Sequence, residues 1–172
     1  MKRLTRCRFA VVPLLGALLV TLALPSQTRA AEAAPAREPV VGLPCEGCEA
    51  VFVGMPAAPP AQARIAPASE PGEPLRIRGT VLAADGKPAA GVIVYAYQTD
   101  AGGLYPADPA TQQAGVRHGR LRGWARTDAS GGYQFDSIRP GGYPGTSIPQ
   151  HVHMHVIEPG RCTYYIDDIL FT

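Results

Sequence analysis

Hydrophobic and polar residues alternate in short runs over the C-terminal part of the chain, and turn residues separate these runs. Between residues 75 and 83, Ile77 and Val81 alternate with polar neighbours, as in a half-buried strand. Asp85 and Gly86 then supply a hairpin-type turn. No stretch keeps the 3.6-residue period of an amphipathic helix. The pattern therefore predicts short strands and almost no helix.

Six segments of this kind occur between residue 75 and the end of the chain. They share β-branched and aromatic residues, and glycine or proline separates them. The predicted strands cover residues 75–83, 91–98, 121–127, 133–138, 151–157 and 163–171. They predict an all-β fold, an antiparallel β-sandwich with one core. The connection over residues 99–120 is long for a compact domain, which is typical of a functional loop.

The first 30 residues follow a different pattern. Four basic residues precede an apolar run from Phe9 to Leu24, and small residues follow it around Arg29. This arrangement is typical of a signal peptide, because the apolar run is too short and isolated for a membrane span. We therefore expect an exported protein, periplasmic or secreted, that loses residues 1–30 and has no membrane attachment afterwards.

Removal of the signal peptide reverses the sign of the net charge. Residues 1–30 hold five of the 16 Lys and Arg and none of the 14 Asp and Glu, which leaves 11 basic against 14 acidic residues, or −3. The basic balance of the whole chain thus belongs to the export signal. A mildly acidic mature chain gives no reason to expect a nucleic-acid partner.

Residues 31–74 are rich in proline and alanine, and nine of the 18 prolines lie there. We expect a linker that buries little surface and stays extended. Cys45 and Cys48 form a C-x-x-C island within it. They can form a small-loop disulfide or stay as thiols, and a metal site is less favoured because no second C-x-x-C exists. The β-sandwich domain is then expected over residues 75–172, truncated at its C-terminus because the chain ends inside an apolar run.

Three of the four histidines occur at spacing two, at positions 151, 153 and 155. In an extended strand these residues share one face, while Val152 and Met154 point to the other. Neighbours on one face lie roughly 6–7 Å apart, so two imidazoles can bind one metal ion. The strand is a candidate metal site, and exposed histidines without a ligand role are the alternative.

Several motifs also follow one another in an order that resembles a known enzyme family. They are Gln98-Thr-Asp100 with Tyr105, Thr127-Asp-Ala-Ser-Gly-Gly-Tyr-Gln-Phe135, Pro140-Gly-Gly-Tyr143-Pro and Pro149-Gln-His151-Val-His153. This order resembles the intradiol ring-cleavage dioxygenases, non-haem iron(III) enzymes that open catechols between the two hydroxyl groups. The second and third motifs also occur in non-catalytic transthyretin-like modules. The two tyrosines combined with His-x-His are therefore what indicates the dioxygenases.

The resemblance implies a metal, its ligands and two substrates. The Fe(III) ligands would be Tyr105, Tyr143, His151 and His153, and Tyr143 would also take up a substrate proton. Two phenolates and two imidazoles suit hard Fe(III) better than Zn(II), which usually takes His, Cys or carboxylate ligands. The implied substrates are a small aromatic diol and O2, and family members often form homodimers.

Two positions depart from the family pattern. Ile148 stands where the family typically has an arginine that polarises the substrate, and Asp168 where it often has a glutamine near the substrate. His155 has no counterpart, and we expect a surface residue or one that orients a ligand by hydrogen bonding. Because of these departures, two other functions stay open: an exported metal-binding sandwich without ring cleavage, and a structural transthyretin-like module without a metal.

Overall fold

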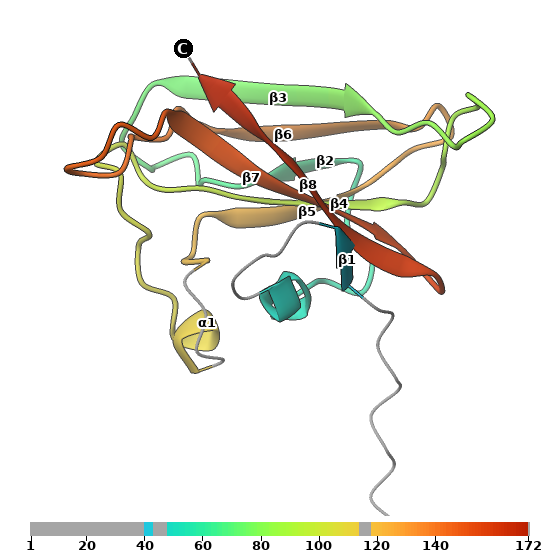
Figure 1. Cartoon of the computed structure of the whole chain (residues 1–172), viewed down its shortest axis with the longest axis horizontal. Helices are drawn as coiled ribbons and strands as arrows, with labels where there is room; N and C mark the ends of the chain where they lie inside the picture. The colour runs from blue at the N-terminus through green and yellow to red at the C-terminus, as the bar shows by residue number, and fades with distance from the viewer. Residues whose placement is uncertain (1–39, 43–47, 114–117, 172) are drawn as a thin grey trace, which may run out of the picture. The chain divides into compact units, whose positions relative to one another are not determined.

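The computed structural model describes residues 40–42, 48–113 and 118–171 of the chain (Figure 1). The predicted signal peptide lies outside these ranges. Cys48 is buried and disulfide-bonded, and its predicted partner Cys45 also lies outside the described residues. Cys162 is a free cysteine. Among the described residues, no helix has both the length and the apolar character that a membrane span requires.

Two β-sheets make up the described domain. The larger has the strand order β1 (Val40–Gly42), β8 (Cys162–Phe171), β7 (Gln150–Glu158), β4 (Ile93–Tyr97) and β5 (Arg122–Arg126). The smaller has the order β2 (Gln62–Arg64), β6 (Gly132–Ile138) and β3 (Pro74–Thr80). Among the described strand pairs, only β1–β8 and β2–β6 are parallel. A 3-10 helix, η1 (Cys48–Phe52), and a short helix, α1 (Pro109–Gln113), complete the described elements. The predicted all-β sandwich is confirmed.

The main core lies between the two sheets. Phe135 of β6 is fully buried there, against residues of β4 and β7 that include Val94, Val152 and Met154. Complete burial of one such side chain contributes about 2 kcal/mol. All six predicted strands are present, with ends within three residues of those expected. The inward orientation predicted for Val152 and Met154 is also confirmed.

Residues 48–74 belong to the folded domain, so the predicted linker is wrong for this part of residues 31–74. β2 pairs with β6, and Ile65 and Ala66 are buried in the main core. Val51 is buried on the opposite face of the larger sheet, where its carbonyl accepts a 2.7 Å hydrogen bond from Trp124 Nε1. The segment contributes isolated apolar residues between prolines. Because it lacks the alternation of a strand, its pattern is that of a linker.

The larger sheet therefore has two covered faces. One packs against the smaller sheet. The other carries a second cluster, with Tyr95 and Tyr97 of β4 beside Ile157 of β7, and the segment around Val51 covers part of it. Tyr105, from the long connection between β4 and β5, packs against the same cluster. This second face holds the candidate site.

Candidate metal centre

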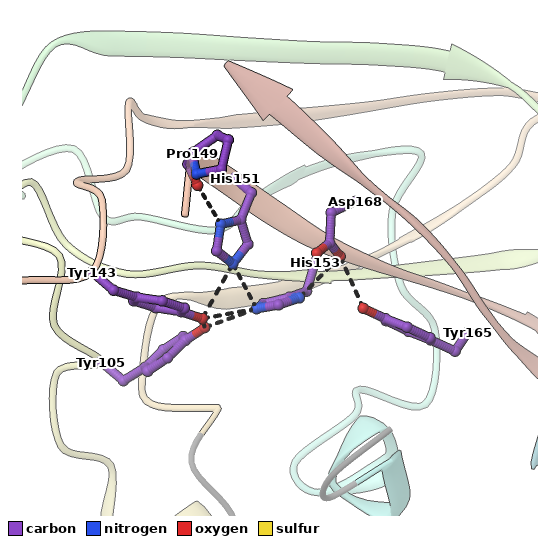
Figure 2. Close-up of polar contacts among 7 residues, drawn as sticks. All are labelled: Tyr105, Tyr143, Pro149, His151, His153, Tyr165 and Asp168. Atoms are coloured by element: carbon purple, nitrogen blue, oxygen red, sulfur yellow. Dashed lines mark hydrogen bonds and ion pairs between the residues drawn. The ribbon is translucent and has the colours of Figure 1, made fainter. Parts of the chain in front are cut away.

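Strand β7 carries its histidines on the face turned away from the main core. His151 and His153 turn their Nε2 atoms toward the same point, and the two atoms lie 3.1 Å apart (Figure 2). Both side chains are largely shielded from solvent, since His151 is 7% exposed and the side chain of His153 is 15% exposed. The strand periodicity thus brings two imidazole nitrogens together as predicted.

Two loops add phenol oxygens at the same point. Tyr105 Oη lies 2.9 Å from His153 Nε2. Tyr143 Oη lies 3.2 Å from the Nε2 atoms of both His151 and His153. The two phenol groups also hydrogen-bond to each other. All four residues named as iron ligands from the sequence therefore meet at one place, although they come from three separate segments (Figure 2).

The loops that carry the two tyrosines touch backbone to backbone. Gly103 has a φ of +82°, and a Cβ atom there would lie 1.9 Å from the carbonyl oxygen of Gly142. A Cβ atom on Gly141 would lie 2.4 Å from the backbone nitrogen of Gly103. The backbone N–H of Gly141 donates a 2.7 Å hydrogen bond to Asp100 O. Only glycine permits so close an approach, and this contact fixes the two phenols relative to each other.

The outer nitrogens of both histidines contact groups that only accept hydrogen bonds. His151 Nδ1 lies 2.7 Å from the carbonyl oxygen of Pro149, and His153 Nδ1 lies 2.9 Å from Asp168 Oδ1. Each Nδ1 therefore carries a proton, so Nε2 is the ring nitrogen that is available to bind a metal. The two Nε2 atoms and the two phenol oxygens lie together as possible donors to one cation. Histidine ligands of metals are oriented in the same way.

The phenols are neutral when no metal is bound. Burial is the main cause that raises the pKa of Tyr105, and its hydrogen bond to Tyr143 raises this pKa further. Burial also raises the pKa of Tyr143, although the same hydrogen bond acts in the opposite direction there. A strongly charged cation displaces such protons, as it does from other coordinating groups. Two phenolates and two imidazoles are a donor set that fits Fe(III).

Asp168 occupies a different place from the one expected for a residue near the substrate. It lies beyond the His153 ring, where it accepts hydrogen bonds from His153 Nδ1 and, at 3.2 Å, from Tyr165 Oη. Burial is the largest single influence and opposes ionisation of this carboxyl, but the hydrogen bonds from His153 and Tyr165 and the two nearby imidazoles together outweigh it, so the pKa of Asp168 is lowered. Two consecutive acidic residues in an apolar strand were the available signal for this role.

His155 is neither a surface residue nor a hydrogen-bonded partner of a ligand, so the expectation for it was wrong. It is 1% exposed, and neither ring nitrogen has a hydrogen-bond partner among the described residues. The ring packs against the aromatic rings of Tyr95 and Tyr165. Burial lowers the pKa of His155 to about 4, so the ring is neutral. The third histidine of the strand behaves as a core residue.

The layer behind the site contains two residues that sequence reasoning did not assign to it. Tyr97 stacks on His153 with ring centroids 4.4 Å apart, and His118 stacks on the other side of Tyr97 at 3.8 Å. His118 is 2% exposed, and its Nδ1 lies 2.8 Å from the hydroxyl of Tyr95. A periodic pattern of tyrosines in β4 is present in the sequence, but nothing in it indicates that His118 packs on them.

A family model described as a dioxygenase matches residues 51–171 of the chain. Catechol 1,2-dioxygenase 1 of Acinetobacter lwoffii is 41% identical over 71 residues, which are 41% of this chain and 22% of that protein. Catechol 1,2-dioxygenase 2 of the same organism is 33% identical over 114 residues, which cover 57% of this chain and 40% of the relative. The chain therefore spans less than half the length of these curated relatives.

Solved structures agree with this assignment. The dioxygenase domain of a dioxygenase and carbohydrate-binding protein fusion from Streptomyces sp. SirexAA-E superposes with a TM-score of 0.51 at 30% identity, and covers 68% of each chain. Catechol 1,2-dioxygenase from Acinetobacter sp. ADP1 superposes with a TM-score of 0.52 at 27% identity, over 66% of this chain and 42% of that one. The fold, the order of the motifs and the family model agree, and the chain belongs to the intradiol ring-cleavage dioxygenase family.

Proposed function

We propose that this protein is a non-haem Fe(III) dioxygenase that cleaves a catechol-type aromatic diol with O2 between its two hydroxyl groups. The observation that carries the proposal is the meeting of Tyr105 Oη, Tyr143 Oη, His151 Nε2 and His153 Nε2 at one point. These four residues would hold the iron. Bound Fe(III) would supply Lewis acidity and a template for the two diol oxygens.

The residues around the iron would divide the remaining work between them. His151 and His153 are fixed from behind through their Nδ1 atoms, so they keep their orientation when a substrate enters. Tyr143 lies on the loop before β7 and contacts the other three donors. It would accept a proton from the diol, which uses the basicity of a phenolate in a buried site. Tyr97 closes the back of the site against water by stacking on His153.

Reconstitution of the full-length protein with Fe(III) tests the iron site. Tyrosinate bound to Fe(III) gives a visible charge-transfer band, and we expect Tyr105→Phe and Tyr143→Phe each to remove or shift it. Tyr133→Phe is the matched control, because Tyr133 lies on β6 in the smaller sheet and packs on Phe135. A colourless, iron-free wild-type protein would refute the proposed site, and so would ligand variants whose spectra match that of the control.

Oxygen consumption with a panel of catechols then tests ring cleavage. Ile148 favours a second function, a metal-binding domain without this activity, because the side chain is 51% exposed and carries no charge to polarise a diol. In the first case the wild-type protein consumes one O2 per diol and forms a ring-opened diacid. In the second case the wild-type protein is coloured but inactive. An Ile148→Arg variant that gains turnover would show that this position limits the activity.

We also propose that the protein is exported, because basic residues, an apolar run and small residues follow one another in its first 30 positions. The test is expression of the full chain in a Gram-negative host, followed by mass measurement of the protein in the periplasmic fraction. We expect a mature chain that begins near Ala31. Unprocessed protein confined to the cytoplasm would overturn the proposal.

A further inference from the structure

The two histidines of the site differ in what holds their outer nitrogens. His151 donates from Nδ1 to a neutral backbone carbonyl, that of Pro149. His153 donates from Nδ1 to a carboxylate, that of Asp168 (Figure 2). A hydrogen bond to an ionised acceptor is roughly twice as strong as one between neutral groups. It also draws the proton further from the ring, which increases the electron density that Nε2 can offer to a metal.

A local irregularity of the sheet places this carboxylate. Along β7 and β8, Val152 pairs with Ile169 and Met154 pairs with Ile166, so the single residue His153 lies opposite both Asp167 and Asp168. This is the two-against-one count of a β-bulge, a feature that redirects side chains next to active sites. Asp168 is turned to His153 and Tyr165, whereas Asp167 is exposed. Without the bulge, the alternation of β8 would not leave two residues opposite one imidazole.

The remaining contacts hold Asp168 in this orientation. The hydroxyl of Tyr165 donates to the same oxygen that His153 contacts, at 3.2 Å. The Tyr165 ring packs on His155, two residues along β7 from His153. The side chain of Asp168 is 20% exposed, so water competes only in part for its oxygens. The carboxylate is therefore directed at one ligand and not into the space where the four donors meet.

We propose that Asp168 is a positioning residue that fixes the tautomer of His153 and makes it the stronger of the two imidazole ligands. The second half of this proposal rests on the iron site proposed above, and the first half holds for the metal-free protein as well. The asymmetry has a consequence for the metal. If His153 donates more electron density, the iron draws less from the tyrosinates. The energy of the tyrosinate charge-transfer band therefore depends on the charge of the Asp168 side chain.

The first measurement uses metal-free protein and nitrogen-15 NMR of the histidine rings. We expect His153 to show a protonated Nδ1 and an unprotonated Nε2 in the wild type. In Asp168→Ala, the chemical shifts should move toward a mixture of the two tautomers. Asp167→Asn is the matched control, because it removes the same charge from the adjacent residue of the same bulge and should leave the shifts unchanged. A wild-type tautomer that is unaffected in Asp168→Ala would overturn the positioning role.

The second measurement uses iron-loaded protein and competition with a chelator. We expect Asp168→Ala to lose roughly 10–100-fold in iron affinity. The isosteric variant Asp168→Asn should lose less, and its charge-transfer band should move to longer wavelength. Asp167→Asn should match the wild type in both respects. If all three variants match the wild type, the role of Asp168 is refuted while a coloured wild type still supports the iron site. If the wild type binds no iron, the proposed function fails, and the nitrogen shifts alone decide the orientation of His153.

Discussion

The two faces of strand β7 are built on different principles. On one face, Val152 and Met154 lie in the main core, where close packing decides what is tolerated. On the other face, His151 and His153 are placed by hydrogen bonds to single atoms, Pro149 O and Asp168 Oδ1. Packing accepts exchanges of similar volume, whereas a hydrogen bond depends on the direction of one donor. Strand β7 thus has a packed face, which maintains the fold and tolerates exchanges of similar volume. It also has a histidine face, which positions the site and depends on individual hydrogen bonds.

The largest expected effect comes from damage to the packed face. Phe135→Ala would leave a cavity opposite β7, because Phe135 is fully buried against residues of both sheets. We expect a loss of about 3–5 kcal/mol in the free energy of unfolding, measured by urea denaturation. Leu82→Ala is the control, because Leu82 is 57% exposed and should change stability by less than about 0.5 kcal/mol. Equal losses in both variants would mean that Phe135 does not anchor the core.

A second variant disturbs the site on the histidine face of β7 without changing any of the four candidate ligands. Gly103→Ala would force a Cβ atom against Gly142 O and separate the loops that carry Tyr105 and Tyr143. We expect loss of the charge-transfer band in iron-loaded protein and a loss of about 1–2 kcal/mol or more in stability. Gly145→Ala is matched, since Gly145 also has a positive φ, of +74°, but its Cβ atom would meet nothing within 4 Å. A band that survives in Gly103→Ala would show that the loop contact does not position the phenols.

The difference between the two faces also decides what the sequence can reveal. Alternation is a local property, so the six strands and the inward direction of Val152 and Met154 follow from it. The convergence of Tyr105 and Tyr143 with the histidines was expected from a resemblance, and not from spacing, because it depends on loop contacts between residues about 40 positions apart. The role of Asp168 depends on a bulge between β7 and β8. Register is a property of the pairing between two strands, so the pattern of one strand does not reveal which residue of the other lies opposite it.

The N-terminal part of the domain is a second case in which the sequence pattern does not reveal what is buried. Ile65 and Ala66 are buried in the main core, and Val51 is buried beneath β4 and β5, yet prolines surround them. Proline-rich segments that pack through single residues have the composition of a linker. Their burial is decided by the two sheet faces that they cover. The predicted boundary at residue 75 was therefore wrong, whereas the strands that follow it were predicted well.

His155 lies on the histidine face of β7, but its ring has no hydrogen-bond partner among the described residues. Removal of a buried group without hydrogen bonds should be neutral or stabilising, so we expect His155→Leu to raise the free energy of unfolding of metal-free protein by about 1 kcal/mol at pH 7. Burial lowers the folded-state pKa to about 4, so unfolding takes up a proton below the unfolded value of about 6.5. Stability is therefore greatest above pH 6.5 and falls as the pH decreases toward 4, by on the order of 3 kcal/mol.

Urea denaturation of the metal-free wild type and of His155→Leu across this pH range measures the effect. The slope between pH 6.5 and 4 should be smaller in the variant, because the proton uptake of His155 on unfolding is removed. Thr163→Val is a suitable control, since Thr163 is also fully buried with a hydroxyl that lacks a partner among the described residues, but it does not titrate. Identical pH slopes in wild type and His155→Leu would contradict a neutral, buried His155.

The smallest expected effect comes from Tyr165, which donates a hydrogen bond to the same carboxylate oxygen that His153 contacts. Tyr165→Phe removes a hydrogen bond to Asp168 Oδ1 and keeps the ring that packs on His155. The carboxylate then offers more negative charge to His153, so the charge-transfer band of iron-loaded protein should move to shorter wavelength, opposite to the shift in Asp168→Asn. Tyr164→Phe is the control, because the adjacent side chain points to the other face of β8. Shifts of the same sign in Tyr165→Phe and Asp168→Asn would mean that general disturbance of the bulge, and not the charge on the carboxylate, sets the donor strength of His153.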